Sequence, residues 1–199
     1  MSPRKISLFA AAGLAALALA ACNKPASTGA APDQSNEAVN AAQDAASTAT
    51  GAVAAPAGAM TTDGFVTNAG VAGMYEIEAA KVALQRSNNP KIKELAQKLI
   101  DDHTKAAAEL KTIAAGISGV MVPAEMDERH KGLVDNLRGA TNADFDKTYL
   151  DQQNAAHHEA VDLFGGYADH GDNAALKTFA AKTRPALEMH LQMVEALQK

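Results

Sequence analysis

The 199-residue chain has no tryptophan, only three tyrosines and five phenylalanines, and a single cysteine. Its 47% of hydrophobic residues is therefore made up largely of alanine, leucine, valine and methionine, which suits closely packed helices better than a β-sandwich. One cysteine excludes a disulfide within the chain, so the fold must depend on its apolar core. We expect an all-α protein with one folded domain and additional segments.

The sequence also lacks a basic patch and the common catalytic motifs. Its 18 lysines and arginines are outnumbered by 23 aspartates and glutamates, for a net charge of −5. Because acidity opposes binding to phosphates, we expect no nucleic-acid partner. No GxSxG, phosphate-binding loop or HExxH sequence is present. The lack of these motifs favours a protein without enzymatic activity, although it does not decide the question. We assign no catalytic residue.

The longest apolar run is at the N-terminus, in MSPRKISLFAAAGLAALALAAC. Arg4 and Lys5 precede an apolar run over residues 6–19, which is too short for a comfortable membrane span and is followed by small residues. The pattern predicts an export signal peptide over residues 1–21. Its removal would leave 16 basic and 23 acidic residues, a net charge of −7.

Leu19-Ala20-Ala21-Cys22 resembles a lipobox, the processing site of bacterial lipoproteins. The resemblance implies cleavage before Cys22 and acylation of that residue, and several acyl chains form a firm membrane anchor. Asn23 stands where an aspartate would favour inner-membrane retention in enteric lipoproteins. We therefore expect a lipid-anchored envelope protein on the outer membrane, facing the periplasm. The alternative is an ordinary signal peptide with a chance cysteine, and no protein partner can be named from the sequence.

Residues 22–60 are rich in alanine, serine, threonine and proline, and contain few larger apolar residues. Such a composition cannot bury enough surface to order itself, so we expect a disordered tether from lipidated Cys22. Residues 61–199 form the predicted folded domain.

Amphipathic periodicity predicts four long helices in this domain. The first covers about 62–87, and the second begins at the Asn89-Pro90 cap and ends near 115. A short helix is expected over 124–138. The third long helix starts at a capping box formed by Thr141 and Asp144, and the fourth is expected to be capped by Asp172. Two short turns and one long crossover over 116–142 predict a ferritin-like four-helix bundle of two antiparallel hairpins.

Each long helix places one titratable residue on its apolar face, close to one level of the bundle. At about 100° per residue, these positions fall within stripes of apolar side chains. A charge buried alone is very unfavourable, so these groups must be paired, neutral or metal-bound. The four residues are Glu76, His103, His157 and His190.

Two interpretations of this cluster remain open. Three imidazoles and a carboxylate suit a single transition metal such as zinc, iron or copper. Gln153 would then orient the ring of His157, and Asp102 either orients a ligand or is solvated. Alternatively, a metal-free network of hydrogen bonds, with or without water, sets the helix register in a structural or stress-related envelope protein that acts through its surface. His130 also faces the apolar side of its short helix, which weakens the metal interpretation.

Several blocks carry a family resemblance: GMYEIEAAKVALQ, KELAQKLIDDHTKAAAEL, HHEAVDLFGGYADHGD and LKTFAAKTRPALEMHLQMVEAL. They resemble the bacterial ferritin-like "predicted outer membrane protein" family, a domain of unknown function numbered four-one-four-two, over about residues 63–198. The resemblance implies a ferritin-like bundle in the cell envelope and no established reaction. The family's glutamate corresponds to Glu76, and its histidines to His103, His157 and His190.

The chain departs from the di-iron ferritins in its ligand pattern. Those proteins place a glutamate three residues before each ligand histidine. The corresponding positions here are Ile100, Asn154 and Leu187, so no ExxH pair is present. We therefore expect neither ferroxidase activity nor iron storage.

Overall fold

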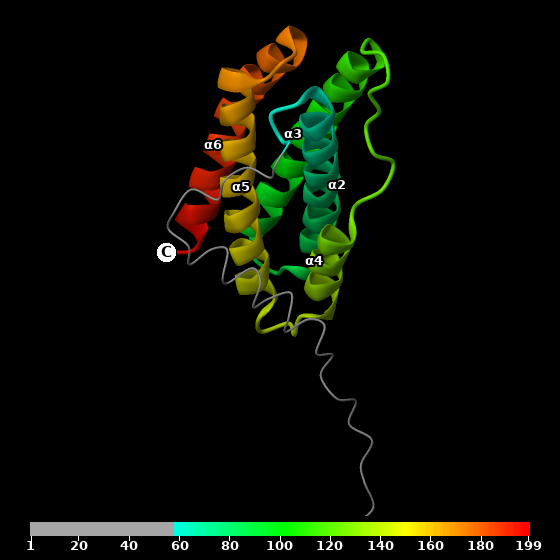
Figure 1. Ribbon diagram of the computed structural model, residues 1–199. Helices are drawn as coiled ribbons and strands as arrows, with labels where there is room; N and C mark the ends of the chain where they lie inside the picture. The colour runs from blue at the N-terminus through cyan, green and yellow to red at the C-terminus, as the bar shows by residue number, and fades with distance from the viewer. Residues whose placement is uncertain (1–57) are drawn as a thin grey trace, which may run out of the picture. The chain divides into compact units, whose positions relative to one another are not determined.

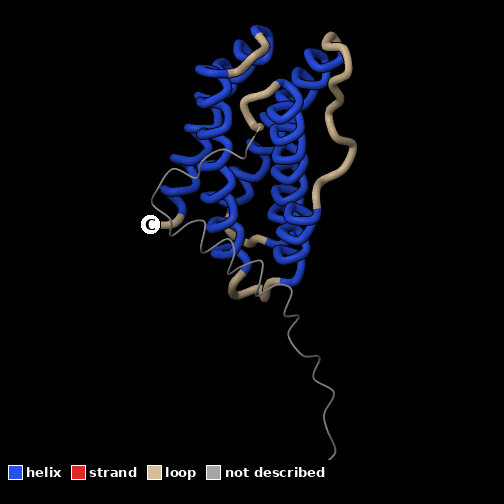
Figure 2. Tube along the Cα trace, viewed as in Figure 1, coloured by secondary structure: helices blue, strands red, loops and turns tan. Residues whose placement is uncertain are grey.

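The computed structural model describes residues 58–199, which contain five helices and, within that range, no strand (Figures 1 and 2). The predicted signal peptide, Cys22 and most of the predicted tether lie outside the described residues. None of the helices in the described range is both long enough and apolar enough to span a membrane. The helices are α2 (Thr62–Arg86), α3 (Pro90–Ala115), α4 (Glu128–Gly139), α5 (Phe145–His170) and α6 (Ala174–Leu197).

The first hairpin forms where its caps predict. Thr61 accepts a hydrogen bond from the backbone N–H of Gly64 and starts α2. Asn89 accepts one from Lys91 at 3.0 Å, and Pro90 follows at the first helical position, where its missing N–H costs nothing. The predicted α2 and α3 boundaries are thus confirmed.

The short helix begins later than expected. Instead of starting near residue 124, α4 starts at Glu128, because Asp127 caps it by accepting the N–H of His130 at 2.8 Å. The capping box expected for α5 was wrong: the helix starts at Phe145, its N-cap Asp144 makes no side-chain cap hydrogen bond, and Thr141 and Asp144 form the turn before it. The Thr141 hydroxyl accepts the Asp144 N–H at 3.3 Å and donates to its carboxylate at 2.6 Å.

The predicted cap of α6 was wrong by one residue. Asn173, not Asp172, accepts the backbone N–H groups of Ala175 and Leu176. Asp172 instead accepts hydrogen bonds from the hydroxyls of Thr62, at 2.6 Å, and Tyr167, at 2.9 Å. It therefore ties the start of α2 to the end of α5.

The four long helices pack as two antiparallel hairpins, α2–α3 and α5–α6 (Figure 1). Helix α2 also packs against α5, and α3 against α6, so each long helix contacts two antiparallel neighbours. The connection after α3 runs back along the bundle and carries α4, which packs on α2 and α5 (Figure 2). This is the hairpin–crossover–hairpin order that defines the ferritin-like arrangement of a helical bundle.

Two contacts hold the crossover in place. At Gly70 a Cβ atom would lie only 2.8 Å from the Val122 side chain, so the absence of a side chain lets the connection approach α2. At the other end of α2, the Arg86 guanidinium donates to the carbonyls of Leu137, Arg138 and Ala140 at 2.6–2.9 Å. Arg86 thereby satisfies carbonyls at the C-terminus of α4 that have no partner within the helix.

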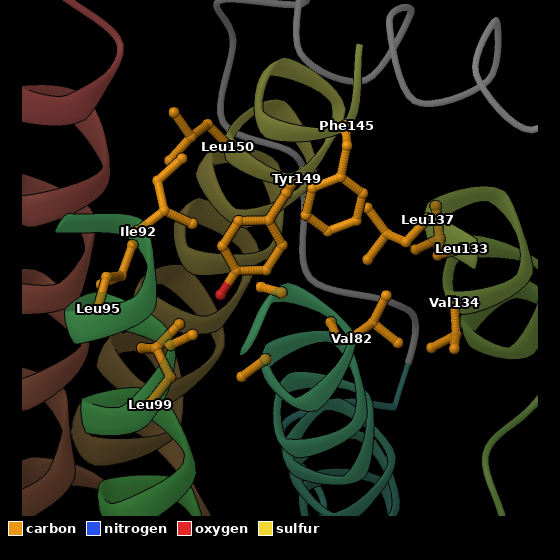
Figure 3. Close-up of a cluster of buried hydrophobic side chains, with 14 of the residues drawn as sticks. Val82, Ile92, Leu95, Leu99, Leu133, Val134, Leu137, Phe145, Tyr149 and Leu150 are labelled. Atoms are coloured by element: carbon orange, nitrogen blue, oxygen red, sulfur yellow. The ribbon is translucent and has the colours of Figure 1, made fainter. Parts of the chain in front are cut away.

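The apolar core consists of two separate clusters. One gathers side chains around the end of α2 and the start of α3, together with α4 and the start of α5 (Figure 3). The other lies toward the start of α2 and the ends of α3 and α5, with Phe65 stacked on Tyr167 at 4.0 Å between ring centroids. Along α3, Leu99 belongs to the first cluster and Leu110 to the second. A layer of polar side chains lies between the two clusters.

Candidate metal centre

Each long helix contributes to this layer at the point where its apolar side chains change from one core cluster to the other. The side chains are buried, with 4% of Glu76, 8% of His103, and 1% each of His157 and His190 exposed to solvent. The four helices therefore bring together the four residues that the sequence placed on a common level.

The three histidines form a compact group. Their ring centroids are separated by 5.9 Å (His103–His157), 5.6 Å (His103–His190) and 5.4 Å (His157–His190). One ring nitrogen of each histidine lies within 4.8 Å of one nitrogen of each of the others. Three points so spaced share a centre no more than about 2.8 Å from each, compared with about 2.0–2.1 Å for a zinc–imidazole bond. Ring movements of up to about 0.8 Å would close that difference.

Hydrogen bonds determine which nitrogens are available. The Nδ1 atom of His157 donates to the carbonyl oxygen of Gln153 at 2.9 Å, because a carbonyl can only accept. In the same way, Nε2 of His190 donates to the Asp102 carboxylate at 2.9 Å. The other nitrogens, Nε2 of His157 and Nδ1 of His190, are buried without a hydrogen-bond partner, as is Nε2 of His103. His157 and His190 therefore each present one nitrogen with a free lone pair, and neutral His103 has one lone pair, on whichever of its two ring nitrogens carries no proton.

The environment keeps all three rings neutral at pH 7. Burial lowers the pKa of His157 to about 4 and lowers the pKa of His103 well below its usual value, with His157 and His190 adding to the effect. Burial also lowers the pKa of His190, although Asp102 opposes it. Neutral imidazole is the form that binds a metal, so the site needs no proton loss before ligation.

Asp102 holds His190 from the edge of the site. Its side chain is 26% exposed and also accepts a hydrogen bond from Lys98 at 3.0 Å. Burial would raise the pKa of Asp102, but the hydrogen bonds from His190 and Lys98 outweigh it and lower the pKa. An ionised carboxylate on the outer nitrogen of a histidine is the usual support of a metal ligand.

Glu76 lies beside the histidine group rather than within it. Its Oε1 is 3.8 Å from Nδ1 of His157, but the two groups are not an ion pair, because burial favours the neutral form of both. Burial raises the pKa of Glu76 to about 8, with the nearby Gln153 side chain opposing the shift. The metal-free site therefore holds a protonated carboxylic acid at neutral pH.

Gln153 orients His157 as expected, but not through its side chain. Its backbone carbonyl, and not its side chain, holds His157. Its side-chain amide is buried without a hydrogen bond, as are Oε2 of Glu76 and the Tyr149 hydroxyl. Tyr149 was not among the residues predicted for the site, because its position among apolar residues of α5 gave no sign of a polar neighbour.

The other inward-facing histidine lies outside the site. The ring of His130 packs 5.4 Å from Tyr75, and its Nδ1 lies 2.6 Å from the Asp127 carboxylate. His130 thus belongs to the start of α4, so it does not weaken the case for a shared centre in the bundle.

Fold and site together define an all-helical bundle with a buried polar centre, and comparison with known proteins assigns its family. The chain belongs to the family described as Domain of unknown function (DUF4142), which matches residues 47–197. This is the domain that the sequence blocks resemble, and the description includes no activity or location. Neither the curated proteins nor the solved structures include a match to the chain.

Proposed function

We propose that this protein is an envelope lipoprotein that binds one transition-metal ion through His103, His157 and His190. The observation that carries the proposal is the convergence of three buried histidines: one ring nitrogen of each lies within 4.8 Å of one of each other ring, and each ring has a buried nitrogen without a hydrogen-bond partner. A buried polar atom without a partner typically costs about 1–3 kcal/mol, so three in one place favour a ligand that satisfies them together.

The donor set indicates the class of metal. Imidazole suits zinc, iron and copper, and at a given site copper(II) binds more tightly than zinc or iron(II). Three protein ligands leave a coordination position open, as in catalytic zinc sites, whereas structural sites are closed by four. A cation held there would favour the ionised form of Glu76, which lies beside the three histidines.

The alternative, a metal-free network that only sets helix register, has a specific weakness. In residues 58–199, all the buried side-chain nitrogen and oxygen atoms without a hydrogen-bond partner belong to Glu76, Tyr149, Gln153 and the three histidines. Protein groups alone therefore leave this network incompletely satisfied, so it would need ordered water to complete it, whereas a metal ion would satisfy the imidazole nitrogens directly.

Metal content tests the proposal directly. Protein purified without chelator, then exposed to zinc or copper and desalted, is expected to hold about one ion per chain by elemental analysis. His103→Leu should lose that ion, whereas His170→Leu, which changes an exposed histidine at the end of α5, should retain it. Absence of stoichiometric metal from the native protein under all these conditions would contradict the proposal.

The lipid anchor is tested separately. Cells fed an alkyne-tagged fatty acid should label the native protein, which should fractionate with the outer membrane. Cys22→Ala should carry no label, because no other cysteine is present to receive the lipid. Labelling of the Cys22→Ala protein, or an unlabelled native protein, would show that the lipobox assignment is wrong.

A further inference from the structure

A cavity adjoins the histidine group on one side. Its wall includes Glu76, His103 and His157, and from there it extends toward the end of the bundle where α2 begins and α3 ends (Figure 1). On α2 its lining continues from Glu76 back to Ala69, about 10 Å along the helix at 1.5 Å per residue. The cavity reaches the surface near Ala107, which is exposed.

The lining of this cavity is almost entirely apolar. Apart from the three site residues, Thr183 is the only polar side chain among its walls, and neither lysine nor arginine lines it. Small residues keep it open: Ala72, Gly73, Ala106 and Ala160 face it from three helices. At Gly73 an added Cβ would have no atom within 4 Å, so the space beside α2 is empty.

The polar end of the cavity points to a ligand. Nε2 of His103, Nε2 of His157 and Oε2 of Glu76 are buried without hydrogen-bond partners, and all three residues line the cavity. The volume open to the centres of water molecules is about 40 Å³. At roughly 10–15 Å³ for each water, this accommodates about three or four atoms of that size, which is enough for a molecule of two or three non-hydrogen atoms.

We propose that this cavity admits small uncharged molecules, of the size of nitric oxide or dioxygen, to the open coordination position of the three-histidine metal site. The inference rests on the proposed metal function. Charge decides the class of ligand, because an anion would have to leave water and cross an apolar channel in which no lysine or arginine pairs with it before it reaches the ion. An uncharged diatomic molecule has no such cost.

The experiment uses the native full-length protein in two states. In the metal-free state, xenon is the probe, and ¹²⁹Xe NMR should show saturable uptake. In the iron(II)-loaded state, nitric oxide is the probe, followed by electron paramagnetic resonance, with azide as the charged comparison. We expect a nitrosyl signal from nitric oxide and no displacement of it by a hundredfold excess of azide.

Variants that fill the cavity test whether nitric oxide reaches the metal site through it. Ala106→Leu places a larger side chain in the cavity one turn from His103, and should slow nitric oxide binding at least tenfold and reduce xenon uptake at unchanged metal content. Ala108→Leu is the matched control, because Ala108 is exposed on the same helix and does not line the cavity. Gly73→Ala adds one methyl group to open space, so it tests the cavity even if Ala106→Leu fails to fold.

The outcomes separate the two proposals. Xenon uptake with no metal binding would contradict the proposed function while leaving the cavity in place. Metal binding with neither xenon uptake nor a nitrosyl signal would overturn this inference alone. Binding of azide as readily as nitric oxide, or equal rates in the native, Ala106→Leu and Gly73→Ala proteins, would also overturn it.

Discussion

Adding zinc or copper to the metal-free protein is expected to raise its melting temperature, and His157→Leu is expected to abolish the increase. A ligand that binds only the folded state stabilises it by about 2.7 kcal/mol at a free concentration of one hundred times its dissociation constant. For a domain of this size that corresponds to a shift of roughly 5–10 °C. Thermal unfolding followed by circular dichroism measures it.

Leucine is the appropriate replacement at His157 because it fills a similar volume. Replacement of a buried polar group by an apolar one is often neutral or stabilising, so the variant should fold without metal. His158→Leu provides the control, since the neighbouring histidine is exposed and outside the group. An equal metal-induced shift in the His157→Leu and native proteins would contradict the three-histidine site.

The free energy of unfolding of the metal-free protein is expected to be greatest near pH 6.5–7 and to fall toward pH 8. Glu76 has a pKa of about 8 when folded and about 4.5 when unfolded, so between these values the folded state holds more protons. Stability then declines as the pH rises, by about 1.4 kcal/mol per pH unit.

The three histidines change the free energy of unfolding with pH in the opposite direction, and they do so at lower pH than Glu76. With the pKa of His157 near 4 when folded and 6.5 when unfolded, the unfolded state holds more protons between those values. Stability therefore rises with pH up to about 6.5, and His103 and His190, whose pKa values are also lowered, add to the rise. Above that pH, only Glu76 still changes the free energy of unfolding with pH.

Glu76→Gln separates these contributions, because glutamine has a similar shape and does not titrate. Urea unfolding at a series of pH values should show the decline between pH 6.5 and pH 8 in the native protein and its absence in the variant. The rise below pH 6.5 should remain in both. A decline of equal slope in the variant would show that Glu76 is not the group responsible.

The helices and their inward-facing residues were predictable from periodicity because burial of an amphipathic helix depends on its own sequence. The 3.6-residue repeat placed Glu76, His103 and His190 on apolar faces, and short turns required antiparallel hairpins. The N-cap of a helix was predictable only where a single suitable cap residue preceded the helix. At Asp172-Asn173 two good cap residues are adjacent, and the choice depended on Thr62, 110 residues away, which binds the aspartate.

The sequence by itself determined the fold class, the level of the polar layer and the identity of the residues in it, because all three follow from local periodicity and helix length. Tertiary structure alone decided which nitrogens are free, which histidine Asp102 holds, that Glu76 stands beside the histidines, and that a cavity adjoins them. Those features depend on side chains from different helices meeting within a few ångströms, and no pattern along one helix encodes that distance.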